Sequence, residues 1–133
     1  MIHNHYVIMS IIMFFSGLLS TMNIWVDNIK DIRYSLNDVY MSLLMTGWML
    51  LFMGLINWKK NVVIIGLLLV IGSIWCIRTQ FLIDETQYKL GMIPHHSMAI
   101  HMSKKLLDKN NNIQDFLNNL IVTQQNEIIF LKK

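Results

Sequence analysis

Three long apolar runs dominate the first part of the chain, at about residues 6–25, 39–58 and 62–78. The first two contain no charged residue and have about the 20 residues that a helix needs to cross the apolar part of a bilayer. The third is shorter, but the Arg78 side chain can reach toward water and residues 81–83 can add apolar length. No Lys or Arg precedes the first run, which favours a retained span over a cleaved signal peptide. The pattern predicts three membrane-spanning helices.

The links between the runs predict how the spans are connected. Only Lys59, Lys60 and Asn61 separate the second run from the third, so these two spans are expected to form an antiparallel hairpin. Residues 26–38 are polar and mixed in charge, and are expected to lie outside the hydrocarbon. Three spans place the turn on one side of the membrane, and residues 26–38 with the C-terminal segment on the other. The basic residues beside the spans lean toward a cytoplasmic C-terminal segment.

The last part of the chain, residues 79–133, is more polar and is predicted to form a helical hairpin. Pro94 suits the first turn of a helix, because its missing N–H is not needed there, and this helix is expected to end near Lys109. Residues 110–112 are three asparagines, a turn signal, and a second helix is predicted over residues 113–131. The expected fold class is all-α, with a membrane domain (1–78) followed by a short antiparallel helical hairpin domain (79–133).

The second of these helices has an apolar face that also carries two polar residues, Gln124 and Glu127. The apolar members of the face are Ile113, Phe116, Leu117, Leu120, Ile128 and Leu131. An amide and a carboxylate on such a face need partners, unless the helix end is already in water. If the helices meet closely at the turn, residues near 95 lie opposite residues near 125. His95 and His96 are therefore expected to meet Gln124 and Glu127.

The first helix of the hairpin carries histidine and methionine together. His95, Met98 and Met102 share one face with His101 at its edge, whereas His96 points about 100° away from His95. His95 and His96 are thus poorly placed to chelate one ion together. The better pairs are three residues apart: His95 with Met98, and Met98 with His101. Imidazole and thioether together suit copper, and thioether especially suits Cu(I). The alternative is that these histidines are ordinary core residues with hydrogen-bond partners.

The second apolar run repeats methionine at every fourth position. These residues are Met41, Met45, Met49 and Met53. A row of thioethers along one helix face could hold or pass Cu(I), but methionine also fills irregular gaps between helices, and packing is the favoured interpretation.

The composition agrees with a membrane protein. Apolar residues make up 54% of the chain and charged residues only 14%, well below the share in soluble domains. The net charge of +3 is scattered and shows no stripe for nucleic acid. A single cysteine, Cys76, excludes an internal disulfide framework and a multi-cysteine zinc site.

Several segments together resemble a known family. They are Asp84, then MIPHHSMAIHM at residues 92–102 and IVTQQNEI at residues 121–128, with weaker likeness at residues 38–45 and 78–80. The chain resembles the membrane-anchored form of domain-of-unknown-function family 305 over about residues 28–133. The resemblance implies a ferritin-like, extracytoplasmic helical domain, and in some members copper bound through Met and His. Carried over, it implies as ligands His95, His96, Met92, Met98, His101 and Met102. It implies that Asp84 and Glu127 are polar partners or ligands, and that Gln124 is a polar partner.

Two functions follow from these patterns. The first is an integral, multi-pass membrane protein that binds or hands over copper at the membrane face, with Glu127 orienting a histidine. The second is a structural or assembly protein in which the His/Gln/Glu cluster is a buried hydrogen-bond network without metal. A redox enzyme is disfavoured, because the chain lacks the Glu-x-x-His spacing of di-iron bundles and shows no catalytic constellation. The expected partners are the lipid bilayer, a metal ion and a second copy of the chain, and not nucleic acid.

Overall fold

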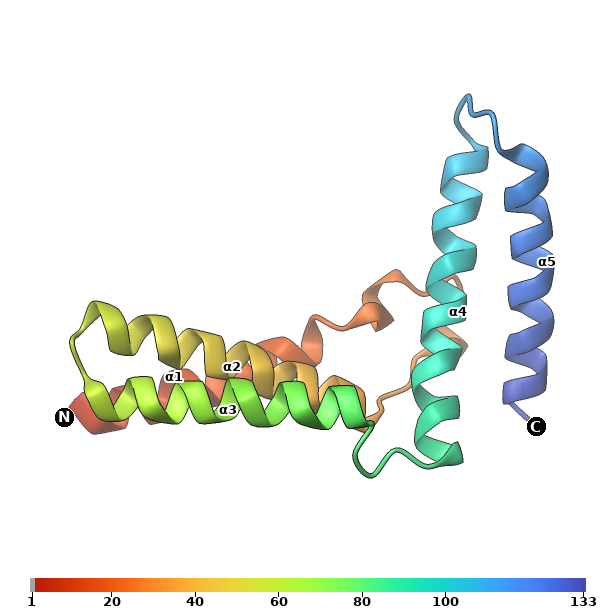
Figure 1. Cartoon of the computed structure of the whole chain (residues 1–133). Helices are drawn as coiled ribbons and strands as arrows, with labels where there is room; N and C mark the ends of the chain where they lie inside the picture. Colours follow the sequence, from red (N-terminus) through yellow and green to blue (C-terminus); the bar gives the residue numbers. More distant parts are fainter. Residues whose placement is uncertain (1) are drawn as a thin grey trace. The chain divides into compact units, whose positions relative to one another are not determined.

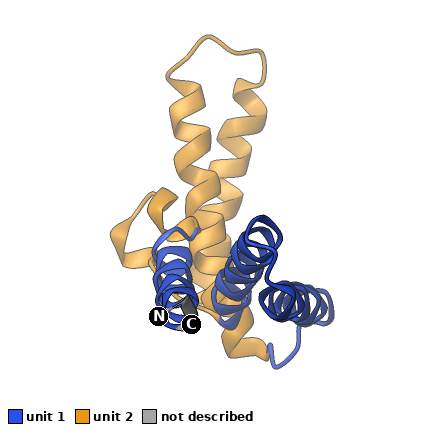
Figure 2. Ribbon diagram, turned by 90° about the vertical axis from the view of Figure 1, so that its left-hand side faces the viewer, with its two compact units in different colours: residues 1–21, 36–83 blue, residues 22–35, 84–133 orange. Residues whose placement is uncertain are grey.

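The structure is a computed structural model that describes residues 2–133, with side chains from Asn4 onward, and all the regular structure in this part is helical. The α-helices are α1 (Ile2–Leu19), α2 (Leu36–Ile56), α3 (Lys60–Thr79), α4 (Glu85–Leu107) and α5 (Gln114–Leu131), and the 3₁₀ helices are η1 (Met22–Trp25) and η2 (Ile29–Asp31). The chain forms two compact units, coloured separately in Figure 2. Unit 1 comprises Met1–Thr21 and Leu36–Ile83, and unit 2 comprises Met22–Ser35 and Asp84–Lys133.

The three apolar segments are long and apolar enough to cross a membrane, as the sequence predicts. The spans are Asn4–Trp25, Leu36–Ile56 and Lys60–Thr79, with mean hydropathies of 1.9, 1.9 and 2.3. Most of their residues are not buried within the structure, so the apolar side chains face outward, as lipid requires. The first span is not one continuous helix, because α1 ends at Leu19 and the chain turns before η1.

Helices α2 and α3 lie side by side as an antiparallel pair (Figure 1), and glycine lets them approach closely. A Cβ added to Gly66 would lie 2.5 Å from the backbone nitrogen of Leu51, and one added to Gly54 would lie 2.7 Å from that of Val63. Such contacts between backbones are the usual basis of helix association in lipid. Helix α1 packs on α2 in the same way, since a Cβ on Gly17 would lie 2.9 Å from that of Ser42.

In unit 2, α4 begins nine residues before the predicted start, so the assignment of Pro94 to the first turn is wrong. The cause lies at Asp84, whose carboxylate accepts a hydrogen bond of 2.8 Å from the Gln87 backbone N–H and so caps the helix. Glu85 then pairs with Lys89 at 2.7 Å, and this hydrogen bond and positive charge hold the pKa of Glu85 below its ordinary value. Pro94 lies inside α4 and is fully buried.

Helices α4 and α5 form the antiparallel hairpin that the sequence predicts (Figures 1 and 2). Asn111 closes the turn, because its side chain donates to the carbonyls of Leu106 and Lys109 and accepts from the N–H of Ile113. Leu117 and Ile128 of α5 are buried, whereas Phe116 and the N-cap residue Ile113 are exposed. The buried face is therefore narrower than the face predicted from the pattern.

Residues 22–35 pack along α4 and belong to unit 2. Ser97 of α4 is fully buried, donates from Oγ to Oδ2 of Asp31 at 2.7 Å, and accepts from the backbone N–H of Asp27 at 3.0 Å. The second oxygen of Asp31 binds the Lys132 ammonium at the end of the chain. We call Ser97, Asp31 and Lys132 the Asp31 cluster. It joins three segments that are far apart in the sequence.

Candidate metal-binding groove

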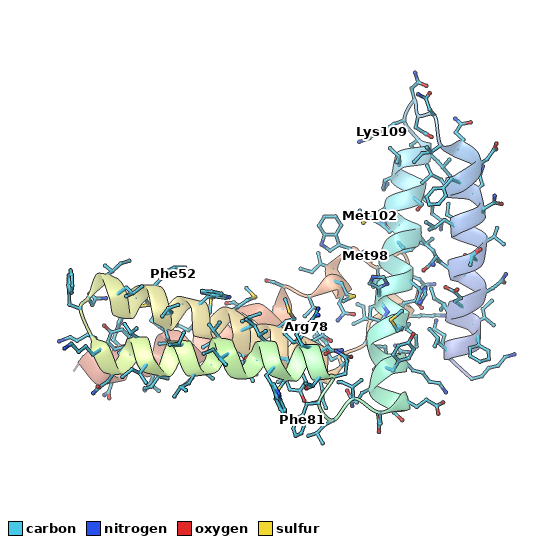
Figure 3. All side chains as sticks on the ribbon, viewed as in Figure 1. Phe52, Arg78, Phe81, Met98, Met102 and Lys109 are labelled. Atoms are coloured by element: carbon cyan, nitrogen blue, oxygen red, sulfur yellow. The ribbon has the colours of Figure 1, made fainter. Side chains whose placement is uncertain are left out.

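A groove in unit 2 brings together four of the predicted metal ligands. His95, Met98, His101 and Met102 all line it, and its volume is about 610 Å³. At 100° per residue these four positions fall within roughly a third of the circumference of α4, which is why one groove can take them all. Figure 3 shows Met98 and Met102 on the same side of α4. We call this site the His/Met groove.

The rest of the His/Met groove is formed by residues of α5, of η1 and of the C-terminal end of α4. Phe116, Leu117 and Leu120 of α5 form one apolar wall, and Trp25 of η1 contributes an aromatic ring. Lys105 and Lys109 place two ammonium groups at the groove. Trp25 and these lysines are not among the residues predicted from the sequence. The position of Trp25 depends on how residues 22–35 fold onto α4, so no local signal could have found it. Lys105 lies on the same face of α4 as Met98 and Met102, and the helical period could have found it.

The donor atoms of the His/Met groove are accessible. His95 and Met102 are exposed, whereas Met98 and His101 are half-buried. Within residues 4–133, neither His95 nor His101 has a hydrogen-bond partner for its ring nitrogens. Their lone pairs are therefore available to a ligand from solvent, and the thioethers of Met98 and Met102 are weak acceptors that suit a soft cation.

His96 lies on a different side of α4 and contacts α5. Its Nδ1 meets Oε1 of Gln124 and lies 3.0 Å from Oε2 of Glu127. Both oxygens are acceptors, so Nδ1 must carry a proton to bond either of them. The structure thus brings His96 to the two polar residues of α5. It does not bring His95 there, because His95 points about 100° away, and the two rings meet only edge to face at 5.9 Å.

The remaining predicted residues lie outside the His/Met groove. Met92 is half-buried one turn before His95, and the Asp84 carboxylate is used as the cap of α4. In the part of the chain that the structure describes, no group of three or more His, Cys, Asp or Glu could hold a metal ion. The donors gathered in the groove are therefore two imidazoles and two thioethers.

The methionines of the second span are spread along α2 in unit 1. Met41 is exposed, whereas Met45, Met49 and Met53 are half-buried. The close contacts of α2 are made by Gly47 and Gly54 instead. A role for these methionines beyond packing stays a prediction.

Comparison with known proteins identifies the family. The chain is 46% identical to the uncharacterized protein L153 of Acanthamoeba polyphaga mimivirus over 131 residues, which cover 91% of this chain and 84% of that protein. Residues 83–133 match the family model described as domain of unknown function (DUF305). This chain belongs to the DUF305 family. The matched residues cover α4 and α5, so the DUF305 region contains most of the His/Met groove and all of the His96 contacts. No solved structure matches the chain.

Proposed function

We propose that this DUF305 protein is a multi-pass membrane protein that binds Cu(I) in the His/Met groove of unit 2 and holds it for transfer at the membrane face. The observation that carries the proposal is the convergence of His95, Met98, His101 and Met102 on one groove. The accessible ring nitrogens and the soft thioethers are the donor types that Cu(I) prefers over harder cations. The bound ion would be a soft, monovalent cation that a transfer partner could remove.

The lysines of the groove favour a monovalent over a divalent ion. Lys105 and Lys109 are exposed and repel a cation in proportion to its charge, so Cu²⁺ or Zn²⁺ would meet twice the repulsion that Cu(I) meets. Divalent zinc would also seek more imidazole, thiolate or carboxylate ligands than the groove offers. His96 is left out of the donor set because it lies on another side of α4 and does not line the groove.

We expect the full-length protein in a mild non-ionic detergent to bind one Cu(I). Replacing Met98 and Met102 together with leucine should weaken binding about 100-fold, because each lost ligand removes on the order of a factor of ten. His95→Gln should weaken it roughly tenfold for the same reason. The measurement is competition with a chromogenic Cu(I) chelator under anaerobic, reducing conditions.

The matched control for this titration is Met41→Leu with Met45→Leu, which removes two thioethers from α2 and leaves the groove intact. That pair should bind Cu(I) like the unaltered protein. Equal affinity of all the variants, or no binding by any of them, would show that the groove is not a copper site.

A second candidate function is structural, and the His96 contacts favour it. The side chain of His96 is only 12% exposed and meets both Gln124 and Glu127, so these three residues tie α4 to α5 without a metal. In this proposal the DUF305 region acts as a rigid helical module for assembly. The family resemblance implies a ferritin-like bundle. In this proposal a second copy of the chain supplies the further helices that such a bundle needs.

His96→Leu should lower the free energy of unfolding of unit 2 by about 1–2 kcal/mol, because it leaves the half-buried Gln124 amide without its partner. Hydrogen exchange of the α4 and α5 amides, without added copper, measures the local effect. His95→Leu is the control and should change stability by less than about 0.5 kcal/mol, since His95 is exposed. If both variants exchange alike, the His96 contacts have no structural role.

A further inference from the structure

A second, separate groove lies in unit 1 at the turn between α2 and α3. Its volume is about 590 Å³, and its apolar walls are Leu55 of α2 with Val63 and Ile64 of α3. Gly54 also lines the groove, where the absence of a side chain lets α2 and α3 meet closely. We call this site the α2–α3 groove. It lies at the end of two helices that are long and apolar enough to cross a membrane, so lipid reaches it if the chain is the membrane protein of the proposed function, on which this inference rests.

Two cations border the α2–α3 groove. Lys59 and Lys60 line it and are exposed, and within residues 4–133 their side chains have no hydrogen-bond or ion-pair partner. The described first turn of α3 contains no acidic residue, and the side chain of Lys59 does not cap the helix. The positive end of the α3 dipole adds to the two ammonium charges. The site therefore combines an apolar wall with uncompensated positive charge.

Trp58 completes the turn in an unusual backbone conformation. Its φ of 54° is in the left-handed region, where glycine is normally favoured, and hydrogen bonds from Trp58 N to Leu55 O and from Lys59 N to Gly54 O close the end of α2. The Trp58 side chain also lines the groove and is 91% exposed. The backbone conformation serves to end α2, as that of Gln80 ends α3. The exposed Trp58 ring lies at the end of an apolar helix, and tryptophan prefers the membrane–water interface.

We propose that the α2–α3 groove binds an anionic phospholipid. Lys59 and Lys60 bind the headgroup phosphate, one acyl chain lies along Leu55 and Ile64, and Trp58 packs at the level of the glycerol. Charge complementarity selects this occupant. A second copy related by two-fold symmetry is disfavoured as the occupant, because Lys59 and Lys60 of one copy would face the same two lysines of the other. A zwitterionic lipid carries a cation next to its phosphate and gains less from the two lysines.

The test is native mass spectrometry of the full-length protein in mixed micelles with equal amounts of phosphatidylglycerol and phosphatidylcholine. We expect one retained lipid, with phosphatidylglycerol favoured roughly tenfold, and loss of this preference in Lys59→Gln with Lys60→Gln. Arginine at both positions keeps the charge and should keep the preference. Lys105→Gln with Lys109→Gln removes the same charge from unit 2 and should also leave the preference unchanged.

Three results would overturn the proposal. The first is equal retention of the two lipids by the unaltered protein. The second is an undiminished preference for phosphatidylglycerol after both lysines become glutamine, with helicity checked by circular dichroism. The third is displacement of the bound lipid by inorganic phosphate alone or by dimer formation. Either result would mean that the groove binds a free anion or a second copy of the chain, and not a phospholipid. Copper binding is not involved in any of these measurements, so the outcome is independent of the His/Met groove.

Discussion

Replacing Gly66 by alanine should break the packing between α2 and α3. The new Cβ would lie 2.5 Å from Leu51 N and 2.9 Å from Gly47 O, and neither atom can move without shifting a helix backbone. We expect a loss of about 2–3 kcal/mol in the free energy of unfolding, at the upper end of what overpacking costs. Thermal unfolding in detergent and hydrogen exchange of the α2 and α3 amides measure this effect.

Gly72→Ala is the matched control for this prediction, because it makes the same chemical change in the same helix. A Cβ at Gly72 would meet nothing within 4 Å. Alanine forms helix better than glycine by up to about 1 kcal/mol, so this variant should be neutral or slightly more stable. Gly66→Ala should therefore lower the stability, whereas Gly72→Ala should not. Equal effects would mean that helix propensity, and not the contact with Leu51, controls the role of Gly66.

The difference between Gly66 and Gly72 also shows what the sequence could and could not predict about unit 1. The apolar runs predicted three helices long enough to span a membrane, because the length of an apolar segment is a local property. In the sequence, Gly66 and Gly72 are both glycines within the third apolar run, and no local pattern distinguishes them. Only the pairing of α2 with α3 decides which of them faces a neighbouring backbone.

Unit 2 shows the same limit at other positions. Pro94 predicts a helix start in the sequence, but the cap at Asp84 and the Glu85–Lys89 pair extend α4 upstream of it. The short turn did predict a register that brings one histidine to Gln124 and Glu127. Because adjacent residues on a helix point about 100° apart, only one of the two histidines can face α5, and in the structure it is His96.

Asp31 is the clearest residue that local sequence reasoning missed. In the sequence it was one charge in a polar loop, expected only to lie outside the membrane. In the structure its side chain is 7% exposed and binds both the fully buried Ser97 hydroxyl and the Lys132 ammonium. Its two partners are 66 and 101 residues away, and no local pattern carries information about contacts over such distances.

We expect Asp31→Ala to cost unit 2 about 3 kcal/mol of stability. The change leaves the Ser97 hydroxyl without its acceptor and the Lys132 ammonium without its counter-ion, and removing one partner of a buried pair typically costs about 3–5 kcal/mol. The half-exposed Lys132 side chain can turn toward water, which places the expected cost at the lower end of that range. Hydrogen exchange of the α4 and α5 amides should show the loss, and residues 22–35 should become exchangeable as well.

Asp27→Ala provides the contrast. Asp27 pairs with Lys104 at 2.6 Å, but their side chains are 24% and 49% exposed, so water can replace the contact. This variant should cost less than about 1 kcal/mol, and added salt should abolish the difference from the unaltered protein. The Asp31 effect should persist at high salt because that carboxylate is buried. If the two aspartates gave equal and equally salt-sensitive losses, the Asp31 cluster would be a surface ion pair and not the contact that fixes residues 22–35 to α4.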